Sequence, residues 1–268
     1  MYSLKDKIAV VTGAGSGIGR ALAQNLAARG CRLALADIDE AGLCETAALL
    51  PRETDVMQAR LDVADRAAVY DFAARVKQTF GTAHVVVNNA GVAVSQTIEN
   101  LSYEDFEWLM GIDFWGVVYG TKAFLPLLRA QNEGAIVNLS SVFGIIAVPT
   151  QGAYNAAKFA VRGFTEALRH ELRGTGVKAI CVHPGGIKTN IARRARFYAD
   201  PSGETDQAKA AAHFDRLART TPERAAEIIV RGVERGTPRV LIGADAWLID
   251  RIQRWFPASY WSLMARFV

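Results

Sequence analysis

Short apolar runs alternate along this chain with longer stretches in which apolar residues recur at helical spacing. The short runs show little polar alternation, which is typical of strands that are buried on both faces of a sheet. We expect seven strands, at residues 8–11, 33–36, 56–63, 85–88, 135–139, 177–182 and 240–242. The longer stretches predict helices at residues 18–28, 66–79, 103–128, 153–173 and 222–235, with glycines as their stops.

This order of strands and helices predicts an α/β fold, built as a doubly wound parallel sheet of about seven strands. The pattern runs on without a repeat, a low-complexity tract or a linker, so we expect a single domain over residues 1–268. Sheets of this kind bind ligands beyond the carboxyl ends of their strands. The residues that directly follow a strand are therefore the first candidates for a site.

Two segments stand apart from the pattern. Residues 187–221 form a long irregular stretch, and we expect a loop that contacts substrate, because long loops in compact domains are often binding loops. Residues 245–268 are aromatic and amphipathic, with Trp247, Trp255 and Trp261 among them. We expect this tail to pack on its own domain or on a second subunit. A lid over the pocket and a peripheral contact with a membrane surface are the alternatives.

Composition narrows the class of protein. The three cysteines are odd in number and widely spaced, so we expect reduced thiols in a cytoplasmic protein rather than disulfides. No apolar stretch is long enough to predict a signal peptide or a transmembrane segment. A net charge of +4 is too small to indicate nucleic acid as a partner. The four histidines lack the spacing of metal ligands, so we expect no metal.

A glycine-rich turn, Thr12-Gly13-Ala14-Gly15-Ser16-Gly17-Ile18-Gly19, follows the first predicted strand. Gly13 permits a tight turn, Gly17 lets the backbone approach a pyrophosphate, and Gly19 lets the next helix pack close to the sheet. The amides of the turn, those of Ser16 and Ile18 included, would face the phosphates at the positive end of that helix. The turn predicts a Rossmann-type dinucleotide site, although such a turn alone is a weak signal.

Asp37 closes the second predicted strand, about twenty residues beyond the turn. At that position a carboxylate accepts hydrogen bonds from the adenosine ribose and repels a 2′-phosphate. The turn carries no Lys or Arg before Arg20. We therefore expect NAD rather than NADP as the cofactor. The alternative is an aspartate that only caps the next helix.

Tyr154 and Lys158 share one face of a predicted helix, because they stand at positions i and i+4. An ammonium beside a phenol favours the phenolate, so we expect Lys158 to lower the pKa of Tyr154 from its ordinary value of about 10. Such a tyrosine can take a proton from an alcohol or give one to a ketone. A Tyr/Lys pair alone is common on helix surfaces, and only its combination with the glycine-rich turn indicates a catalytic site.

Together these residues resemble the short-chain dehydrogenase/reductase family over about residues 5–190. The motifs that carry the resemblance are Thr12-Gly13-x-x-x-Gly17-Ile18-Gly19, Asp62-Val63, Asn88-Asn89-Ala90-Gly91, Ser140-Ser141, Tyr154-x-x-x-Lys158 and Pro184-Gly185. They follow in the family's order and spacing. The resemblance implies an oxidoreductase that transfers a hydride between NAD(H) and a secondary alcohol or its ketone.

The resemblance also implies a role for each matched residue. Ser141 would hydrogen-bond the substrate oxygen, Tyr154 would exchange the proton, and Lys158 would hold the nicotinamide ribose and tune Tyr154. The residues implied to contact the cofactor outside the turn are Asp62 and Val63 at the adenine, Asn89, Ala90 and Gly91 along the adenosine, and Pro184, Gly185, Ile187 and Thr189 around the nicotinamide.

One position departs from the family's pattern. The family usually has Asn where this chain has Asp113, and that Asn orients a water in a proton relay from the catalytic Lys. An ionised Asp can accept a hydrogen bond from that water and from Lys158, but it cannot donate as an amide does. Asp113 is therefore either a catalytic residue with an altered relay or a residue that satisfies backbone donors inside its helix.

Apolar residues flank the matched motifs, among them Val92, Val142, Phe143 and Ile187. Such a lining suits a bulky hydrophobic alcohol or ketone, although the same residues can equally belong to the core. We expect a homodimer or homotetramer. Two other functions stay open: an epimerase or dehydratase that holds NAD tightly, and a non-catalytic regulator that senses NAD(H). The spacing of the glycines in the turn argues against the epimerase or dehydratase, and the presence of the Tyr/Lys pair argues against the regulator.

Overall fold

The computed structural model describes residues 2–264. The strands of its main sheet are β1 (Ile8–Thr12), β2 (Arg32–Asp37), β3 (Val56–Arg60), β4 (Val85–Asn88), β6 (Gly134–Leu139), β7 (Val177–Pro184) and β9 (Arg239–Ile242). A separate short pair joins β5 (Val94–Ser95) to β8 (Arg196–Phe197). The α-helices are α1 (Gly17–Ala27), α2 (Glu40–Ala48), α3 (Arg66–Phe80), α4 (Tyr103–Met110), α5 (Gly116–Gln131), α6 (Gly152–Glu171), α7 (Gln207–Leu217), α8 (Pro222–Arg235), α9 (Ala244–Trp255) and α10 (Tyr260–Met264). Two short helical segments are the π-helical η1 (Gly111–Trp115) and the 3₁₀ turn η2 (Val142–Gly144).

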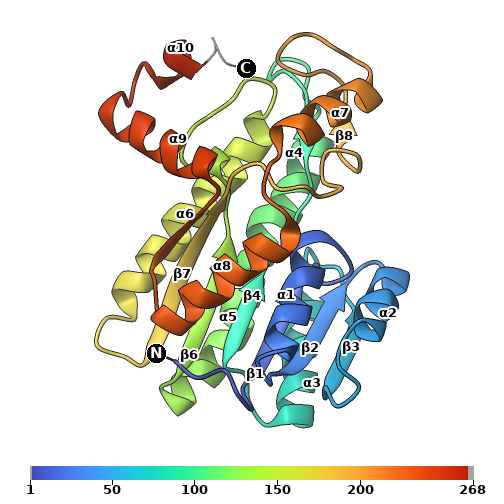
Figure 1. Ribbon diagram of the computed structural model, residues 1–268, viewed down its shortest axis with the longest axis vertical. Coiled ribbons are helices and arrows are strands. Elements are labelled where there is room, and N and C mark those ends of the chain that lie inside the picture. The colour runs from blue at the N-terminus through green and yellow to red at the C-terminus, as the bar shows by residue number, and fades with distance from the viewer. Residues whose placement is uncertain (1, 265–268) are drawn as a thin grey trace.

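The seven strands of the main sheet are all parallel, in the order β3-β2-β1-β4-β6-β7-β9. The chain builds outward from β1 to β3 and then returns to place β4 on the other side of β1, with helices on both faces (Figure 1). This is the doubly wound arrangement, in which the change of direction leaves a crevice at the carboxyl ends of β1 and β4. The predicted α/β fold, with one Rossmann-type sheet of seven strands in a single domain, is confirmed.

Two hydrophobic cores lie on opposite faces of this sheet, because successive strand residues point to opposite sides. In β1, Ala9 and Val11 belong to one core and Ile8 and Val10 to the other, and all four side chains are buried. Helices α1 and α8 close the first core, whereas α3, α5 and α6 close the second. Burial on both faces explains why the strands have nearly continuous apolar sequences.

Three predicted segments differ from the structure. The strand expected at 56–63 already ends at Arg60. The helix expected over 103–128 contains the π-helical segment η1 between α4 and α5, and α5 extends to Gln131. The stretch expected to be irregular, 187–221, contains β8 and α7. Helix α7 forms because its sequence is rich in alanine and because the Asp206 carboxylate accepts hydrogen bonds from its first amides. Helices α2, α9 and α10 are missing from the predictions.

The carboxyl ends of the strands point toward the end of the molecule at which α4, α7, α9 and α10 gather, at the top of Figure 1. There α10 reaches back to the segment between η2 and α6, where the Ala147 amide donates a hydrogen bond of 2.9 Å to the Tyr260 hydroxyl. The last residues of the predicted aromatic tail, 265–268 with Phe267, lie outside the described residues. Across residues 2–264, no helix combines the length and the apolar character needed to cross a bilayer.

Candidate active site

The glycine-rich turn joins β1 to α1 at the carboxyl edge of the sheet. Gly13 and Gly17 have φ angles of 66° and 52°, a left-handed conformation that glycine adopts without steric cost. A Cβ atom on Gly13 would lie 2.8 Å from the Cα of Ala90, and one on Gly19 would collide with the carbonyl oxygen of Gly13. The turn is therefore packed so closely against the segment after β4 that side chains at these positions do not fit.

The N-terminus of α1 begins in this turn. Ser16 is its N-cap, and within the described residues the Ser16 side chain makes no capping hydrogen bond. The first amides of α1 therefore remain available as donors at the positive end of the helix. Across from them, the Cγ2 atom of Thr189 would lie 3.2 Å from a Cβ on Gly17, so the loop after β7 reaches the turn. These features fit a dinucleotide pyrophosphate.

The carboxylate of Asp37 is tied to the turn. Its Oδ2 atom accepts a hydrogen bond of 2.8 Å from the Gly15 amide, and its Oδ1 atom accepts one of 3.0 Å from the Asp39 amide. Each carboxylate oxygen can accept a second hydrogen bond, so acceptor sites remain for ribose hydroxyls. Helix α2 is capped by Asp39, whose side chain accepts from the Gly42 amide, so Asp37 is not the cap of that helix.

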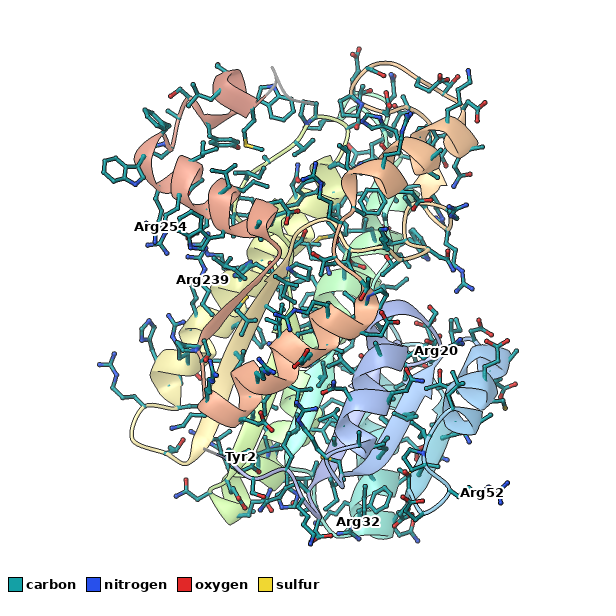
Figure 2. The ribbon with its side chains drawn as sticks, in the orientation of Figure 1. Tyr2, Arg20, Arg32, Arg52, Arg239 and Arg254 are labelled. Atoms are coloured by element: carbon teal, nitrogen blue, oxygen red, sulfur yellow. The ribbon has the colours of Figure 1, made fainter. Side chains whose placement is uncertain are left out.

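Arg20, which directly follows Gly19 in the sequence, folds back onto the glycine-rich turn. Figure 2 labels Arg20, which lies in the first turn of α1. One of its terminal nitrogens donates to the carbonyl oxygen of Gly15 at 2.5 Å and lies 2.7 Å from a carboxylate oxygen of Glu45. Its Nε atom donates to Thr46 Oγ1 at 3.0 Å. The charge of Arg20 is thus already paired within the protein.

The other predicted cofactor residues lie at the same edge of the sheet. Asp62 and Val63 follow β3, and the amide just before them, of Leu61, donates to the carbonyl of Asp37 at 2.9 Å. Gly185 follows β7, where its amide donates to the Ile242 carbonyl of β9 at 2.9 Å. Parallel strands end side by side, so residues far apart in the sequence meet at this edge.

Asn89 and Ala90 hold the glycine-rich turn against β4. The Asn89 side-chain amide donates to the carbonyls of Thr12 and Gly13 at 2.9 and 3.2 Å. The backbone amides of Asn89 and Ala90 donate to the Thr12 hydroxyl at 3.0 and 3.2 Å. These contacts give Asn89 and Thr12 a structural task at the site, which the sequence motifs alone do not reveal.

Ser141, Tyr154 and Lys158 come together from two neighbouring elements. Ser141 follows β6 and accepts a hydrogen bond of 3.1 Å from the Phe143 amide through its hydroxyl oxygen. Tyr154 and Lys158 share one face of α6, where the Lys158 Nζ lies 5.4 Å from the centre of the Tyr154 ring. The Phe143 ring packs edge-on against the Tyr154 ring at 6.0 Å. The glycine segment after β4 adjoins them, since a Cβ on Gly91 would lie 3.5 Å from the Lys158 Nζ.

The pKa of Tyr154 lies above its ordinary value. Burial of the ring raises it, the Lys158 ammonium lowers it, and the Asp113 carboxylate raises it again. The sequence predicts a lowered pKa from Lys158 alone. Lys158 acts in that direction, but the prediction of a net decrease is wrong, because it neglects burial and the charge of Asp113.

Asp113 forms a buried ion pair with Lys158. Its Oδ2 atom lies 3.0 Å from the Lys158 Nζ, and both side chains are almost completely buried. Its Oδ1 atom accepts a hydrogen bond of 2.8 Å from the Val92 amide. The Lys158 Nζ also donates to the carbonyl of Leu139 at 3.2 Å. Asp113 therefore accepts a backbone donor from the segment after β4 and also faces the site.

His183 contacts the backbone of Ser141 through a hydrogen bond. It is fully buried near the end of β7, and its Nδ1 lies 3.0 Å from the Ser141 carbonyl oxygen, to which it donates. Burial lowers the pKa of His183 to about 4, so the ring is neutral. The spacing of the histidines in the sequence argues only against a metal site and gives His183 no other role. The position of His183 next to the Pro184-Gly185 motif is the signal that could have identified it.

The apolar residues that flank the motifs divide into two groups. Val142 and Ile187 belong to the buried core, whereas Val92 and Phe143 are half-buried and remain candidates for a pocket lining. Arg196 of β8 joins the segment after β7 to α4. Its guanidinium lies 3.7 Å above the ring of Trp108 and 2.7 Å from the Asp105 carboxylate, both in α4.

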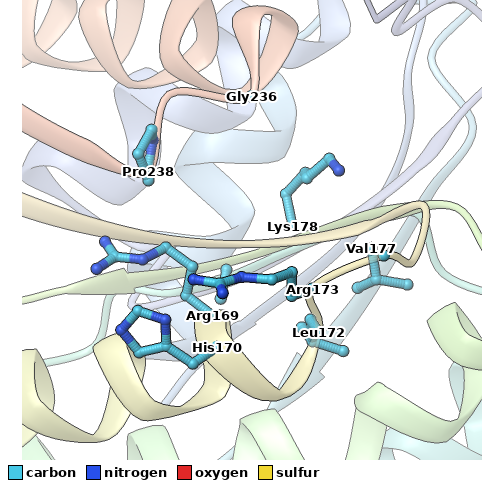
Figure 3. A pocket seen from close by; sticks show the side chains of 10 residues that line it. Arg169, His170, Leu172, Arg173, Val177, Lys178, Gly236 and Pro238 are labelled. Carbon is cyan, nitrogen blue, oxygen red and sulfur yellow. The ribbon is translucent and has the colours of Figure 1, made fainter.

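A cavity of about 310 Å³ lies at the opposite end of the sheet, where α6 ends and β7 begins (Figure 3). Its lining includes Arg169, His170, Arg173 and Lys178. The residues predicted for catalysis or cofactor binding are all outside this lining. The cavity is thus separate from the candidate active site.

The chain belongs to the short-chain dehydrogenase/reductase family of oxidoreductases. The family described as short chain dehydrogenase matches residues 7–197. Among individual relatives, SadH of Mycobacterium tuberculosis, which carries the name of an oxidoreductase, is 52% identical over 99% of this chain and 96% of its own length.

Solved structures of the same family have the same fold. A short-chain dehydrogenase/reductase from Burkholderia phymatum, in complex with NAD, is 31% identical with a TM-score of 0.88, over 95% of either chain. An alcohol dehydrogenase from Thermococcus sibiricus, in complex with 5-hydroxy-NADP, is 27% identical with a TM-score of 0.75, over 89% of this chain and 96% of that one.

Proposed function

We propose that this chain is an NAD-dependent oxidoreductase that interconverts a bulky hydrophobic secondary alcohol and its ketone. The observation that carries this proposal is the gathering of Ser141, Tyr154 and Lys158 beside Gly91, next to a glycine-rich turn with free helix amides. A bound nicotinamide accepts or supplies the hydride. The protein's part is to bind, to orient and to move one proton.

Each of the three side chains has a task in this proposal. The Ser141 hydroxyl orients the substrate oxygen through a hydrogen bond. The Tyr154 hydroxyl gives its proton to a carbonyl oxygen during reduction and takes one from an alcohol during oxidation. The Lys158 ammonium stabilises the phenolate that forms when Tyr154 loses its proton.

Asp37 supports NAD as the cofactor, because its carboxylate stands at the end of β2 with acceptor sites left for ribose hydroxyls. The two solved relatives carry NAD and an NADP derivative, so membership of the family does not by itself select one of them. Arg20, which lies at the turn, is paired with Glu45, and this pairing leaves Asp37 as the dominant charge toward a 2′-phosphate. Around the rest of the cofactor we propose Asp62 and Val63 at the adenine and Thr189 near the nicotinamide.

The substrate class rests on the surroundings of Tyr154. Phe143 and Val92 are half-buried beside it, and the loop after β7, α7 and α10 stand at the same end of the sheet (Figure 1). Such walls suit an apolar substrate with one polar oxygen. The relative from Thermococcus sibiricus is an alcohol dehydrogenase, which supports a CH–OH group as the reacting centre.

We also propose a homodimer or homotetramer in the cytoplasm. Large aromatic side chains are exposed on neighbouring helices, among them Tyr103 of α4, Trp115 of η1 and Phe159 of α6, and such exposure is typical of subunit contacts. The thiols of Cys31, Cys44 and Cys181 are free, which suits a reducing compartment.

The test of this function is a panel of hydrophobic secondary alcohols with NAD⁺, and of their ketones with NADH, read by the absorbance of the reduced cofactor. We expect turnover with at least one pair and little with polar sugars. Binding of NADH without turnover across the panel would favour the non-catalytic regulator instead. NAD that remains bound through purification, without net formation of NADH, would favour the epimerase or dehydratase.

A further inference from the structure

The π-helical segment η1 directs the Asp113 side chain into the interior of the protein. One extra residue in a helical turn changes which side chain faces inward, and π segments often mark functional sites. Here the segment Gly111–Trp115 joins α4 to α5 without a break, and Asp113 at its centre is completely buried. Its carboxylate meets the end of the Lys158 side chain, which extends from α6.

The hydrogen-bonding capacity of Lys158 is largely used inside the protein. An ammonium has three donors. One faces the Asp113 Oδ2 at 3.0 Å and one faces the Leu139 carbonyl at 3.2 Å. Two protein oxygens thus already contact the ammonium.

Asp113 and Lys158 face each other as an ion pair, in which burial raises the pKa of the Asp113 carboxyl while the Lys158 ammonium and the Val92 amide lower it. Both oxygens of Asp113 face donors, the Val92 amide at 2.8 Å and the Lys158 ammonium, so a proton on the carboxyl would find no acceptor there. Burial lowers the pKa of Lys158, but the charges of Asp113 and Tyr154 outweigh this effect and raise it. Lys158 therefore keeps its proton.

The other titratable groups near the pair are neutral or paired. Burial raises the pKa of Cys181 in β7 to about 12, and it lowers that of His183 in the same strand to about 4. Arg162 and Glu166 of α6 form an ion pair with each other at 3.1 Å. The uncharged groups around the pair are the Leu139 carbonyl of β6, the Ser141 hydroxyl just before η2 and the Val92 amide after β4. Asp113 is thus the group that balances the charge of Lys158.

We propose that Asp113 is a positioning residue that fixes Lys158 as an ammonium and offsets part of its charge at Tyr154, so that Tyr154 remains a proton donor throughout the neutral pH range. This inference rests on the proposed function, in which Tyr154 exchanges the proton. It makes carbonyl reduction active at neutral pH, because reduction needs the phenol. Alcohol oxidation needs the phenolate and rises only toward alkaline pH. The raised pKa of Tyr154 agrees with this reading.

The first test needs no turnover. The near-ultraviolet absorbance of tyrosinate is titrated in the cofactor-free wild type and in Tyr154→Phe, and the difference gives the titration of Tyr154 alone. We expect it at or above the value of a free tyrosine, about 10. A Tyr154 that titrates near neutral pH would overturn the proposal, and this measurement does not depend on the folding of any Asp113 variant.

The second test is Asp113→Asn, which keeps the shape of the side chain and one acceptor but removes the charge. We expect the tyrosinate titration, the alkaline fall of kcat/KM for reduction and the alkaline rise of kcat/KM for oxidation to move down by about 1–2 pH units, since the negative charge that raises the pKa of Tyr154 has been removed. Thermal unfolding shows whether the variant is folded. A folded variant whose titration and limb stay in place would contradict the proposal.

Asp105→Asn is the matched control. Asp105 is also a buried aspartate, it lies in α4 just before η1, and its partner is Arg196 rather than Lys158. We expect its pH limb to equal that of the wild type. An equal shift of the pH limb in both variants would show that the effect comes from general loosening of this region, and it would contradict the role proposed for Asp113. If neither protein turns over any substrate, the proposed function fails, while the tyrosinate titration still decides the role of Asp113.

Discussion

Asp37 is the residue on which the proposed choice of cofactor depends. Replacing it by Asn keeps an acceptor for the Gly15 amide, now at 2.8 Å from the carboxylate, and removes the negative charge. We expect the ratio of kcat/KM for NADPH to that for NADH to rise about tenfold, which corresponds to about 1.4 kcal/mol of relieved repulsion. Steady-state kinetics with both cofactors measures this ratio.

Asp39→Asn is the control for this change, because it alters the helix cap of α2 two residues away and leaves Asp37 in place. We expect its cofactor ratio to match the wild type. A wild-type enzyme that already prefers NADPH would refute the assignment of Asp37, and Arg20 at the turn would then be the residue to examine.

At the residue scale, the spacing of side chains in the sequence predicted which residues meet at the site. Tyr154 and Lys158 lie on one face of α6, and Ser141 lies beside them. The sequence anticipated Lys158 as a partner of Asp113, but its other partner could not be predicted, because it is the Val92 backbone amide after β4. Such contacts depend on how strands and helices pack, which a local pattern does not contain.

At the scale of elements, α10 is the part of the tail that rests on the rest of the chain. Its Tyr260 hydroxyl accepts a hydrogen bond from the Ala147 amide, between η2 and α6, whereas Trp255 before it is 78% exposed. A chain that ends after Pro257 loses this contact. We expect the melting temperature to fall, because one lost hydrogen bond costs about 1 kcal/mol of folding free energy. A lid role would instead raise KM for bulky substrates and leave KM for NADH unchanged.

The matched control for the truncation is Tyr260→Phe, which removes the hydroxyl and keeps the ring. Light scattering on both variants reports whether the tail joins subunits, and co-sedimentation with vesicles reports whether it binds a membrane surface. If the truncated protein kept its kinetics, its mass, its vesicle binding and its melting temperature, none of the roles proposed for the tail would hold.

Strands and long helices were predicted well, because burial on both faces and amphipathic spacing are strong local signals. The π segment η1 carries no such signal, since an extra residue in a turn leaves the apolar pattern of the predicted 103–128 helix almost unchanged. The sequence does carry a signal for α7, because its alanines and the capping Asp206 favour a helix. The Asp-Pro-Ser-Gly sequence at 200–203, just before it, is typical of a turn and favours a loop instead.

At the scale of the whole molecule, His183 links folding to pH. Its ring is buried between β7 and the Ser141 segment, and within the described residues its Nε2 has no hydrogen-bond partner. Burial lowers its pKa to about 4, against 6.5 in the unfolded chain, so the unfolded state binds the proton more readily. The free energy of unfolding therefore falls as pH drops from 6.5 toward 4, by about 2 kcal/mol at pH 5 from this residue.

His183→Asn tests this dependence, because an Asn amide can still donate to the Ser141 carbonyl but does not titrate in this range. Chemical denaturation at pH 7 and pH 5 gives the free energy of unfolding of each protein. We expect a smaller loss between the two pH values in the variant. Equal losses would show that His183 is not the group responsible.

The doubly wound sheet explains how one site is assembled from distant parts of the chain. The glycine-rich turn follows β1, Asp37 ends β2, Gly91 follows β4, Ser141 follows β6, and Thr189 follows β7. The strands are parallel, so all these positions fall at one edge, where α6 presents Tyr154 and Lys158. The central claim is that Tyr154 moves the proton at this edge.

Tyr154→Phe tests that claim most directly, with Tyr119→Phe as the control, since Tyr119 is stacked on Trp115 in a different helix. The measurement is kcat with the best substrate of the panel, together with the Kd for NADH from fluorescence. We expect kcat to fall by about 10²- to 10⁴-fold in Tyr154→Phe, with Kd nearly unchanged, because only the proton donor is lost. A kcat close to that of the wild type would contradict the account.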